Sequence, residues 1–284
     1  MKTRNLKYLF ISVLILALGS CESEKTDIQD QIVNQEINEK DETALGDRFF
    51  GRSSSDCHFD YEGPSGPDFW ADLCGEDWKD CAGNSQSPIN IITSSIYGDD
   101  GINNINTNYK TSTTEIINNG HTIQFNYSAG SSASLNNIDY DLLQFHFHTG
   151  SEHTVDGYRY PMEMHLVHQD PVTGLLAVVG LFFTAGVENE VLSQFMDNLP
   201  SEGGDHYVSN DEYHIKNIFP SSMDFYTYSG SLTTPACSEI VTWYVVRESI
   251  EASHEQLERF EHIMHENFRP LQALNGRVVR SNDN

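Results

Sequence analysis

The stretch Leu142–His168, LLQFHFHTGSEHTVDGYRYPMEMHLVH, indicates the fold of this chain. It contains two runs with β-strand character, Leu142–His148 and Glu163–His168, joined by the polar, glycine-containing connection Thr149–Tyr160. Alternate side chains of a strand point to the same face of its sheet. The stretch therefore predicts a β-hairpin with its polar side chains gathered on one face.

Three histidines lie on that predicted face. His146 and His148 share it on the first run, and His165 has the matching parity on the second, so the three imidazoles meet if the strands pair in register. A histidine pair alone is more often a polar strand face than a ligand set, but three imidazoles without a fourth protein ligand are typical of catalytic zinc. Gln144 and Glu163, each two residues before a histidine, supply acceptors that orient the rings.

The remaining pattern predicts one mainly β domain. The expected strands are short runs of β-branched and aromatic residues bounded by Gly, Asn, Ser or Pro: Thr122–Tyr127, Leu142–His148, Glu163–His168, Leu175–Phe183 and Ile240–Arg247. Two helices are expected, over Glu188–Leu199 from its apolar spacing and over Ser253–Asn267 from a Ser-x-x-Gln capping box.

The histidine stretch closely resembles the zinc core of the α-class carbonic anhydrases. The likeness covers most of Cys57–Arg280 and includes the motifs QSPIN (Gln86–Asn90), NNGH (Asn118–His121), YSGSLTTP (Tyr228–Pro235), VTW (Val241–Trp243) and NFRP (Asn267–Pro270). It implies a large, twisted, mostly antiparallel central sheet with peripheral helices and a conical cleft leading to zinc. It also implies a zinc lyase that hydrates CO2 reversibly to bicarbonate and a proton.

The resemblance assigns roles to the metal site. Zinc falls to His146, His148 and His165, which donate to Gln144, to the main-chain carbonyl of Asn267 and to Glu163, respectively. Attack on CO2 would come from zinc hydroxide.

The resemblance also assigns the groups around the substrate. The hydroxyl of Thr233 donates to a buried Glu152 and orients the hydroxide, and the Thr233 N–H faces the substrate oxygen. The residues implied to line the substrate site are Val167, Val178, Leu232, Thr234, Val241 and Trp243.

His121 is the implied proton carrier. Tyr61, Asn118, Asn119 and Gln124 match polar cleft residues that hold ordered water in relatives. The alternative is that His121 is a turn residue that tolerates positive φ after Asn118–Asn119–Gly120.

Several positions depart from the family pattern or offer other histidines. Thr149 stands where a tryptophan usually follows the second ligand, and Gln169 replaces another aromatic residue, so looser packing and faster zinc release are expected. His153 and His168 are interpreted as structural. His262 and His265, on one face of the last predicted helix, are interpreted as exposed surface and not as a metal pair.

Five cysteines are present. If Cys21 carries lipid, the other four are even in number and lie outside the cytoplasm, which favours two disulfides with three pairings open. The resemblance to exported bacterial members implies Cys81–Cys237, which leaves Cys57–Cys74.

The N-terminal segment predicts export. Residues 1–20 have a basic start and a short apolar run, and the ending Leu18–Cys21 resembles a bacterial lipobox that would lipidate Cys21. Residues 21–47 are interpreted as an acidic tether, with the catalytic domain over 48–281. The expected product is a periplasmic or cell-surface lipoprotein anchored to a bacterial membrane; the alternative is plain secretion with Cys21 as an incidental thiol.

Charge narrows the choice of partners. The chain carries 42 Asp+Glu against 16 Lys+Arg, a net charge of −26, which argues against nucleic acid and against adsorption to anionic lipid headgroups. CO2 and bicarbonate are the expected small-molecule partners, and a homodimer stays open. Two rival functions are a catalytically idle zinc domain used for binding and a zinc esterase, since the same metal chemistry attacks activated esters.

Overall fold

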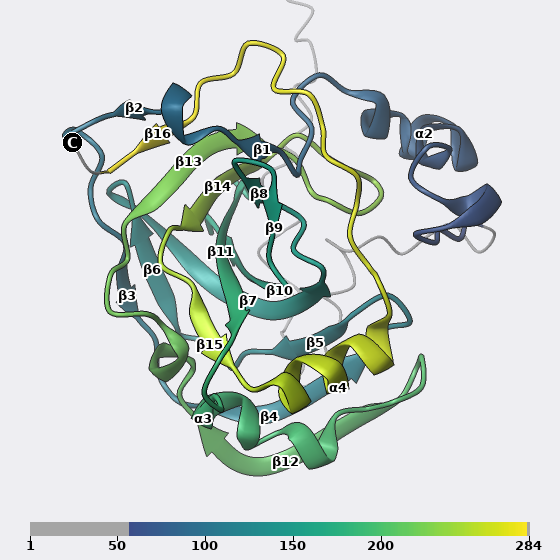
Figure 1. Ribbon diagram of the computed structural model, residues 1–284, viewed down its shortest axis with the longest axis vertical. Helices are drawn as coiled ribbons and strands as arrows, with labels where there is room; N and C mark the ends of the chain where they lie inside the picture. The colour runs from purple at the N-terminus through teal and green to yellow at the C-terminus, as the bar shows by residue number, and fades with distance from the viewer. Residues whose placement is uncertain (1–56, 283–284) are drawn as a thin grey trace, which may run out of the picture. The chain divides into compact units, whose positions relative to one another are not determined.

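A 13-stranded mixed sheet dominates residues 57–282, the part of the chain described by the computed structural model (Figure 1). Its main path runs β12 (His206–Tyr213), β4 (Ser112–Asn118), β5 (Ile123–Asn126), β7 (Ile138–Thr149), β10 (Met162–Gln169), β11 (Leu176–Ala185), β14 (Val241–Val246), β13 (Phe225–Gly230), β16 (Arg280–Ser281) and β2 (Tyr97–Gly98). Off this path, β15 (Ile250–Ala252) pairs with β11, and β6 (Ser132–Leu135) pairs with β7 and β3 (Asn106–Asn108).

Most neighbouring strands are antiparallel. The exceptions in the large sheet are β11 with β14, β11 with β15, and β16 with β2, which are parallel. A separate three-stranded sheet contains β1 (Asn90–Ile91), β8 (Thr154–Val155) and β9 (Tyr158–Arg159). The predicted fold class, mainly β with a large and mostly antiparallel sheet, is confirmed.

The predicted hairpin is the pair β7 and β10. The two strands are antiparallel neighbours, with His146 opposite His165 and His148 opposite Glu163. The connection between them is not a simple loop, because it contributes the short strands β8 and β9 to the smaller sheet. The other three predicted strands correspond to β5, β11 and β14.

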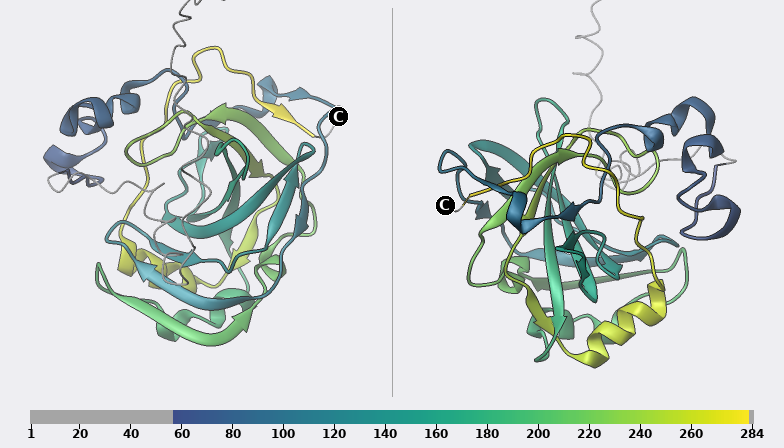
Figure 2. Two further views of the ribbon diagram at one scale, coloured as in Figure 1. Left: turned by 180° about the vertical axis from the view of Figure 1, so that it is seen from behind. Right: turned by 45° about the horizontal axis from the view of Figure 1, so that its top comes forward.

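Helices are short and few in the described residues. They are α2 (Trp70–Leu73), α3 (Glu190–Ser193) and α4 (His254–Met264), with 3₁₀ turns at Gly63–Ser65, Gly75–Asp77, Lys79–Ala82, Thr93–Ser95, Met196–Asn198 and Ile215–Ile218. Helix α4 begins with the expected capping box between Ser253 and Gln256, and it packs against β7. In Figure 2 it lies at the end of the domain away from α2.

The helix expected over Glu188–Leu199 is wrong in extent. Its residues form α3 and then a separate 3₁₀ turn. Leu199 is extended at ψ 121° because it precedes Pro200, and a residue before proline avoids the α region. The apolar side chains still face the core. The spacing therefore predicted which residues are buried but not how long the helix is.

The two faces of the sheet bury different side chains. Phe145 and Phe147 of β7 enter the larger apolar cluster, which also receives Phe260 of α4. On the opposite face, Val167 and Trp243 belong to a second cluster. Burial of one such large apolar side chain contributes about 1.5–3 kcal/mol, so this alternation fixes which face of β7 carries its histidines.

Both expected disulfides, Cys57–Cys74 and Cys81–Cys237, are present, with Cα–Cα distances of 5.9 Å and 4.8 Å. Within residues 57–282 no helix is long and apolar enough to cross a bilayer. The predicted signal peptide, Cys21, the tether and the start of the domain at residue 48 lie outside the described residues.

Candidate active site

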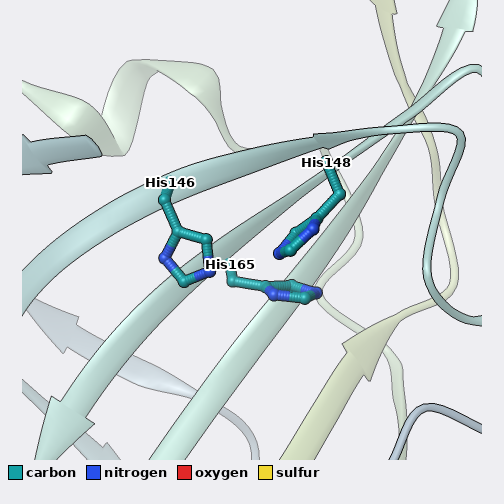
Figure 3. A group of neighbouring side chains, drawn as sticks. All are labelled: His146, His148 and His165. Carbon is teal, nitrogen blue, oxygen red and sulfur yellow. The ribbon is translucent and has the colours of Figure 1, made fainter. Parts of the chain in front are cut away.

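Three imidazoles converge on one face of the sheet (Figure 3). His146 and His148 come from β7 and His165 comes from β10, with ring centroids 5.1, 5.2 and 4.6 Å apart. One nitrogen of each ring lies within 4.8 Å of the others, and all three side chains are buried. The strand register that pairs His146 with His165 produces this cluster.

Each ring is oriented through its other nitrogen. His146 Nδ1 lies 3.0 Å from Gln144 Oε1, His148 Nδ1 lies 2.7 Å from the Asn267 carbonyl, and His165 Nε2 lies 2.9 Å from Glu163 Oε1. These acceptors require N–H at those positions, which leaves a lone pair on Nε2 of His146, Nε2 of His148 and Nδ1 of His165. The three contacts are those that the resemblance implied.

The donor set fits zinc. Three neutral imidazole nitrogens with an open fourth position are the ligands of a catalytic zinc site. The buried His148 Nε2 has no hydrogen-bond partner among the described residues, which a metal ligand would explain. Burial and the neighbouring His148 and His165 lower the pKa of His146 well below its usual value, and burial lowers that of His148. Both rings are therefore neutral at neutral pH, the form that binds metal.

Glu163 is held as a carboxylate. Burial alone would raise its pKa, but His153 and His165 hold the pKa well below its usual range. His153 contacts both carboxylate oxygens, through its main-chain N–H at 2.9 Å and its Nδ1 at 2.8 Å. His153 Nε2 lies 2.7 Å from the Tyr228 hydroxyl, which donates to Ser87 at 2.9 Å. His153 thus has a specific structural role, because it holds Glu163, the hydrogen-bond acceptor for His165.

Gly180 is a supporting residue that the sequence analysis missed. It lies opposite His165 on β11, and a Cβ placed there would be 3.0 Å from Glu163 Oε1. The missing side chain leaves room for the carboxylate. The signal was available, because a single glycine inside the apolar run LAVVGLFF marks a close approach.

Glu152 does not form the contact expected of it. The hydrogen bond from Thr233 is not formed: Glu152 Oε1 accepts from the Arg269 main-chain N–H at 2.9 Å, and Oε2 has no hydrogen-bond partner among the described residues. Oε2 instead lies 3.6 Å from His148 Nε2 and 3.9 Å from His165 Nδ1. The buried carboxylate therefore faces the nitrogens that could bind a metal. Arg269 is a second supporting residue that sequence reasoning missed.

The expected apolar wall lies beside the histidines. Val167 of β10 pairs with Val178 of β11, which pairs with Trp243 of β14. The Trp243 ring is 4.8 Å from the His165 ring. The residues of the expected wall that share this buried cluster are Val167, Val178, Leu232, Val241 and Trp243. Thr233 is buried next to Leu232 in the β13–β14 loop, and Thr234 is half-buried.

His121 lies in the turn before β5. Its ring stacks on Phe59 at a centroid distance of 3.9 Å and lies 5.8 Å from the His58 ring. Burial and the neighbouring His58 lower the pKa of His121, whereas Asp60 raises it. Positive φ in this turn falls on Gly120, at 86°, and not on His121, so tolerance of positive φ does not explain the histidine.

The other expected cleft residues are divided between the site and the turn. Gln124 lies opposite His146 across β5 and β7. Asn118 and Asn119 instead stabilise the turn, accepting from Gly120 N–H and from His121 N–H, each at 3.0 Å. Tyr61 is half-buried, and burial together with Glu152 and Asp60 raises its pKa, so its hydroxyl stays protonated.

The remaining histidines are not part of the site. His168 faces the other side of the sheet and lies 2.7 Å from the Tyr109 hydroxyl. His262 and His265 are exposed and belong to neither metal-compatible group found in residues 57–282. The second such group combines His153 with Glu163 and His165, whose contacts with one another are the hydrogen bonds described above.

The fold and the site together define a mainly β protein that can hold one metal ion on three histidines. The eukaryotic-type carbonic anhydrase family model matches residues 65–283. A carbonic anhydrase from Nostoc sp. is 39% identical over 249 residues, which cover 83% of this chain and 94% of the relative. This chain belongs to the eukaryotic-type, or α, carbonic anhydrase family.

Solved structures agree with this membership. The α-carbonic anhydrase of Thermovibrio ammonificans, in complex with the inhibitor sulfanilamide, matches with a TM-score of 0.76 and 38% identity over 79% of this chain and 99% of that one. A hyperthermostable carbonic anhydrase from a hydrothermal vent chimney matches with a TM-score of 0.75 and 40% identity over 80% of this chain and 100% of that one.

Proposed function

We propose that this carbonic anhydrase uses zinc, held by His146, His148 and His165, to hydrate CO2 reversibly to bicarbonate and a proton. The observation that carries the proposal is the convergence of three oriented imidazole nitrogens within 4.8 Å. When bound, zinc supplies a Lewis acid that lowers the pKa of water to about 7, the established value for carbonic anhydrases. Activated esters are a secondary substrate class for the same site.

The protein's own residues would hold and orient CO2. The apolar wall of Val167, Val178 and Trp243 offers a dry surface beside the histidines, which favours an uncharged gas and strengthens nearby electrostatic interactions. Thr233 is assigned an orienting role, with its main-chain N–H directed to charge that develops on the substrate oxygen. Because Glu152 Oε2 is unpartnered, it is available to the Thr233 hydroxyl if the β13–β14 loop adjusts on ligand binding.

His121 would carry the product proton to solvent. Each hydration releases one proton, and a group whose pKa lies near 7 can accept it and pass it to buffer without a large uphill step. The unperturbed histidine pKa is about 6.5, and burial lowers that of His121. His121 is half-buried in the turn before β5, the strand that carries Gln124 opposite His146.

The test is CO2 hydration measured by stopped flow on zinc-loaded protein, with a sulfonamide inhibitor as control. We expect turnover well above the buffer background and its loss on inhibitor addition. Zinc content by atomic emission provides a readout independent of activity. Background rates from fully zinc-loaded protein would contradict the enzymatic proposal and favour a zinc domain used only for binding.

We also propose that the chain is exported as a lipoprotein. The support is the lipobox-like sequence before Cys21 together with the two disulfides, which persist in oxidising compartments. Cleavage before Cys21 would give a membrane-anchored domain on the acidic tether of residues 21–47. Mass spectrometry of the mature N-terminus should show acylated Cys21; an unacylated start downstream of Cys21 would contradict the anchor.

A further inference from the structure

We propose that Asn267 is a positioning residue. Its side-chain amide holds the main chain of the proton carrier His121 against the strand that carries the metal ligand His148. The inference rests on the proposed function of His121 and goes beyond the main-chain carbonyl of Asn267, which orients His148. It assigns a separate task to the amide of the same residue: to fix the main chain from which the His121 ring projects.

The Asn267 amide uses both of its N–H donors. Its Nδ2 donates to the His121 carbonyl at 2.9 Å and to the Phe147 carbonyl at 3.1 Å. Its Oδ1 accepts from the Thr149 N–H at 2.8 Å. The Thr149 hydroxyl also lies 3.3 Å from Oδ1, but it has a single proton and the His265 carbonyl is the nearer acceptor. Rotating the amide by 180° would place its oxygen against two carbonyls, which fixes its orientation.

His121 depends on side chains for its placement. It precedes β5, which begins at Ile123, so no strand ladder holds it. Its N–H donates to Asn119 Oδ1 and its carbonyl accepts from Asn267 Nδ2, so both flanking peptide groups are held by side chains. Asn267 is only 1% exposed, so water has little access to its amide. Loss of the bond from Asn267 Nδ2 to the His121 carbonyl therefore costs free energy.

The same amide contacts the strand that carries two ligands. Phe147 and Thr149 flank His148 on β7, and both bond the Asn267 side chain through their main chains. The Asn267 carbonyl bonds His148 itself at 2.7 Å. One buried residue therefore sets where the His148 ring and the His121 main chain lie relative to each other.

Thr149 completes this unit. A tryptophan is usual at this position in the family, and the looser packing and faster zinc release expected from its absence stay a prediction. Thr149 is buried, and its hydroxyl contacts both the His265 carbonyl and Asn267 Oδ1. The small hydroxyl side chain holds the Asn267 amide from the side opposite His121.

The kinetic consequence separates positioning from general structure. Proton transfer follows carbon–oxygen chemistry and affects kcat in weak buffer, whereas kcat/KM for CO2 reports the hydration step. Asn267→Ala keeps the main-chain carbonyl for His148 and removes both amide donors. We expect kcat to fall about tenfold and kcat/KM by less than about twofold, with added imidazole restoring kcat.

Two further variants sharpen the experiment. Asn267→Asp is nearly isosteric and keeps an acceptor for Thr149 while removing the N–H donors, so it should show the same loss of kcat if the donors matter. Gln272→Ala is the matched control, since it removes an amide from the same segment. Within residues 57–282 the Gln272 side chain bonds only the Pro270 carbonyl. This control variant should leave both kinetic parameters at their wild-type values.

A double-mutant cycle with His121→Ala tests whether Asn267 acts through His121. Asn267→Ala should lower kcat no further once His121 is absent, because the two residues serve one step. Losses that multiply, a parallel fall in kcat and kcat/KM, or a failure of imidazole to restore kcat would each overturn the inference. If His121→Ala alone leaves kcat unchanged, the proposed proton carrier is wrong, which is a different outcome.

Hydrogen exchange gives a readout that does not depend on activity. In zinc-loaded protein, Asn267→Ala and Asn267→Asp should speed amide exchange over residues 118–124 at least about tenfold, because the turn loses its second anchor. Gln272→Ala should leave this exchange unchanged. Wild-type protection of the segment in both Asn267 variants would overturn the inference.

Discussion

His146 and His165 face each other directly across β7 and β10, with ring centroids 5.2 Å apart and ring planes at 90°. A slip of one residue in this register would send His165 to the opposite face, into the larger apolar cluster. The strand pairing itself therefore determines whether a metal site exists.

The first prediction concerns this pair. His165→Ala should lose zinc and CO2 hydration together, because two imidazoles do not complete a tetrahedral site. Zinc content after dialysis, measured by atomic emission, checks the result. His262→Ala, which removes an exposed histidine from α4, should retain zinc and activity. Full zinc occupancy in His165→Ala would mean that the ligand set is wrong.

Thr233→Ala should retain zinc and lose about 10²-fold in kcat/KM, the usual size of a lost orienting contact. Thr233→Ser keeps the hydroxyl and should recover most of the loss. Stopped-flow hydration and zinc analysis on the same samples separate the two effects. Equal kcat/KM in wild type and Thr233→Ala would remove the hydroxyl from the mechanism.

His121→Ala should lower kcat in weakly buffered solution by about 10-fold or more, while kcat/KM for CO2 stays within twofold. Added imidazole should restore the rate, because it replaces the lost proton acceptor. His214→Ala, at a histidine in the turn after β12, is the control. A fall of kcat/KM in step with kcat would show that His121 shapes the site.

Gly180→Ala should speed zinc loss without changing a ligand. The added Cβ would lie 3.0 Å from Glu163 Oε1, the oxygen that accepts from His165, so the carboxylate of the fully buried Glu163 must shift at this contact. We expect zinc release to a chelator to be about tenfold faster. Ala177→Gly, elsewhere on β11, tests whether general weakening of this strand has the same effect; equal release rates in the two variants would contradict the specific role of Gly180.

His168 should make the protein sensitive to acid. Burial lowers its pKa to about 4, against about 6.5 in the unfolded chain, so the unfolded state binds more protons between these values. The free energy of unfolding should therefore fall as pH drops from about 6.5 to about 4, by up to about 3 kcal/mol from this residue.

His168→Phe should remove that part of the pH dependence. Urea unfolding of metal-free wild type and variant at several pH values measures it, because the ligand histidines contribute equally to both proteins. Parallel stability profiles across this range would show that His168 does not titrate in this way.

The cluster of three histidines could be predicted from the sequence because its arrangement is local and periodic. A period of two places His146 and His148 on one face, and a second strand of the same parity brings His165 beside them. The limits appeared where partners are distant in the chain: Asn267 contacts Thr149 across 118 positions, and no pattern in either segment predicts the hydrogen bonds of the Asn267 amide.

Local geometry set the other limit. The expected helix over Glu188–Leu199 is divided into α3 and a 3₁₀ turn, and the proline after Leu199 explains only the extended residue at its end. The expected bond from Thr233 to Glu152 is absent although Glu152 Oε2 has no hydrogen-bond partner among the described residues. Gly180 could have been found, since a glycine inside an apolar strand already indicates a close neighbour.

The bond from His148 Nδ1 to the Asn267 carbonyl, which spans 119 positions, has a consequence for biosynthesis. A ribosome releases all three ligand histidines about a hundred residues before it releases Asn267, at roughly 5–20 residues per second. A nascent chain that ends before Asn267 can present the three imidazoles but cannot orient His148. The chain thus completes its metal site only after Asn267 has been synthesised, so a product truncated before Asn267 would be poorly metallated even though all three histidines are present.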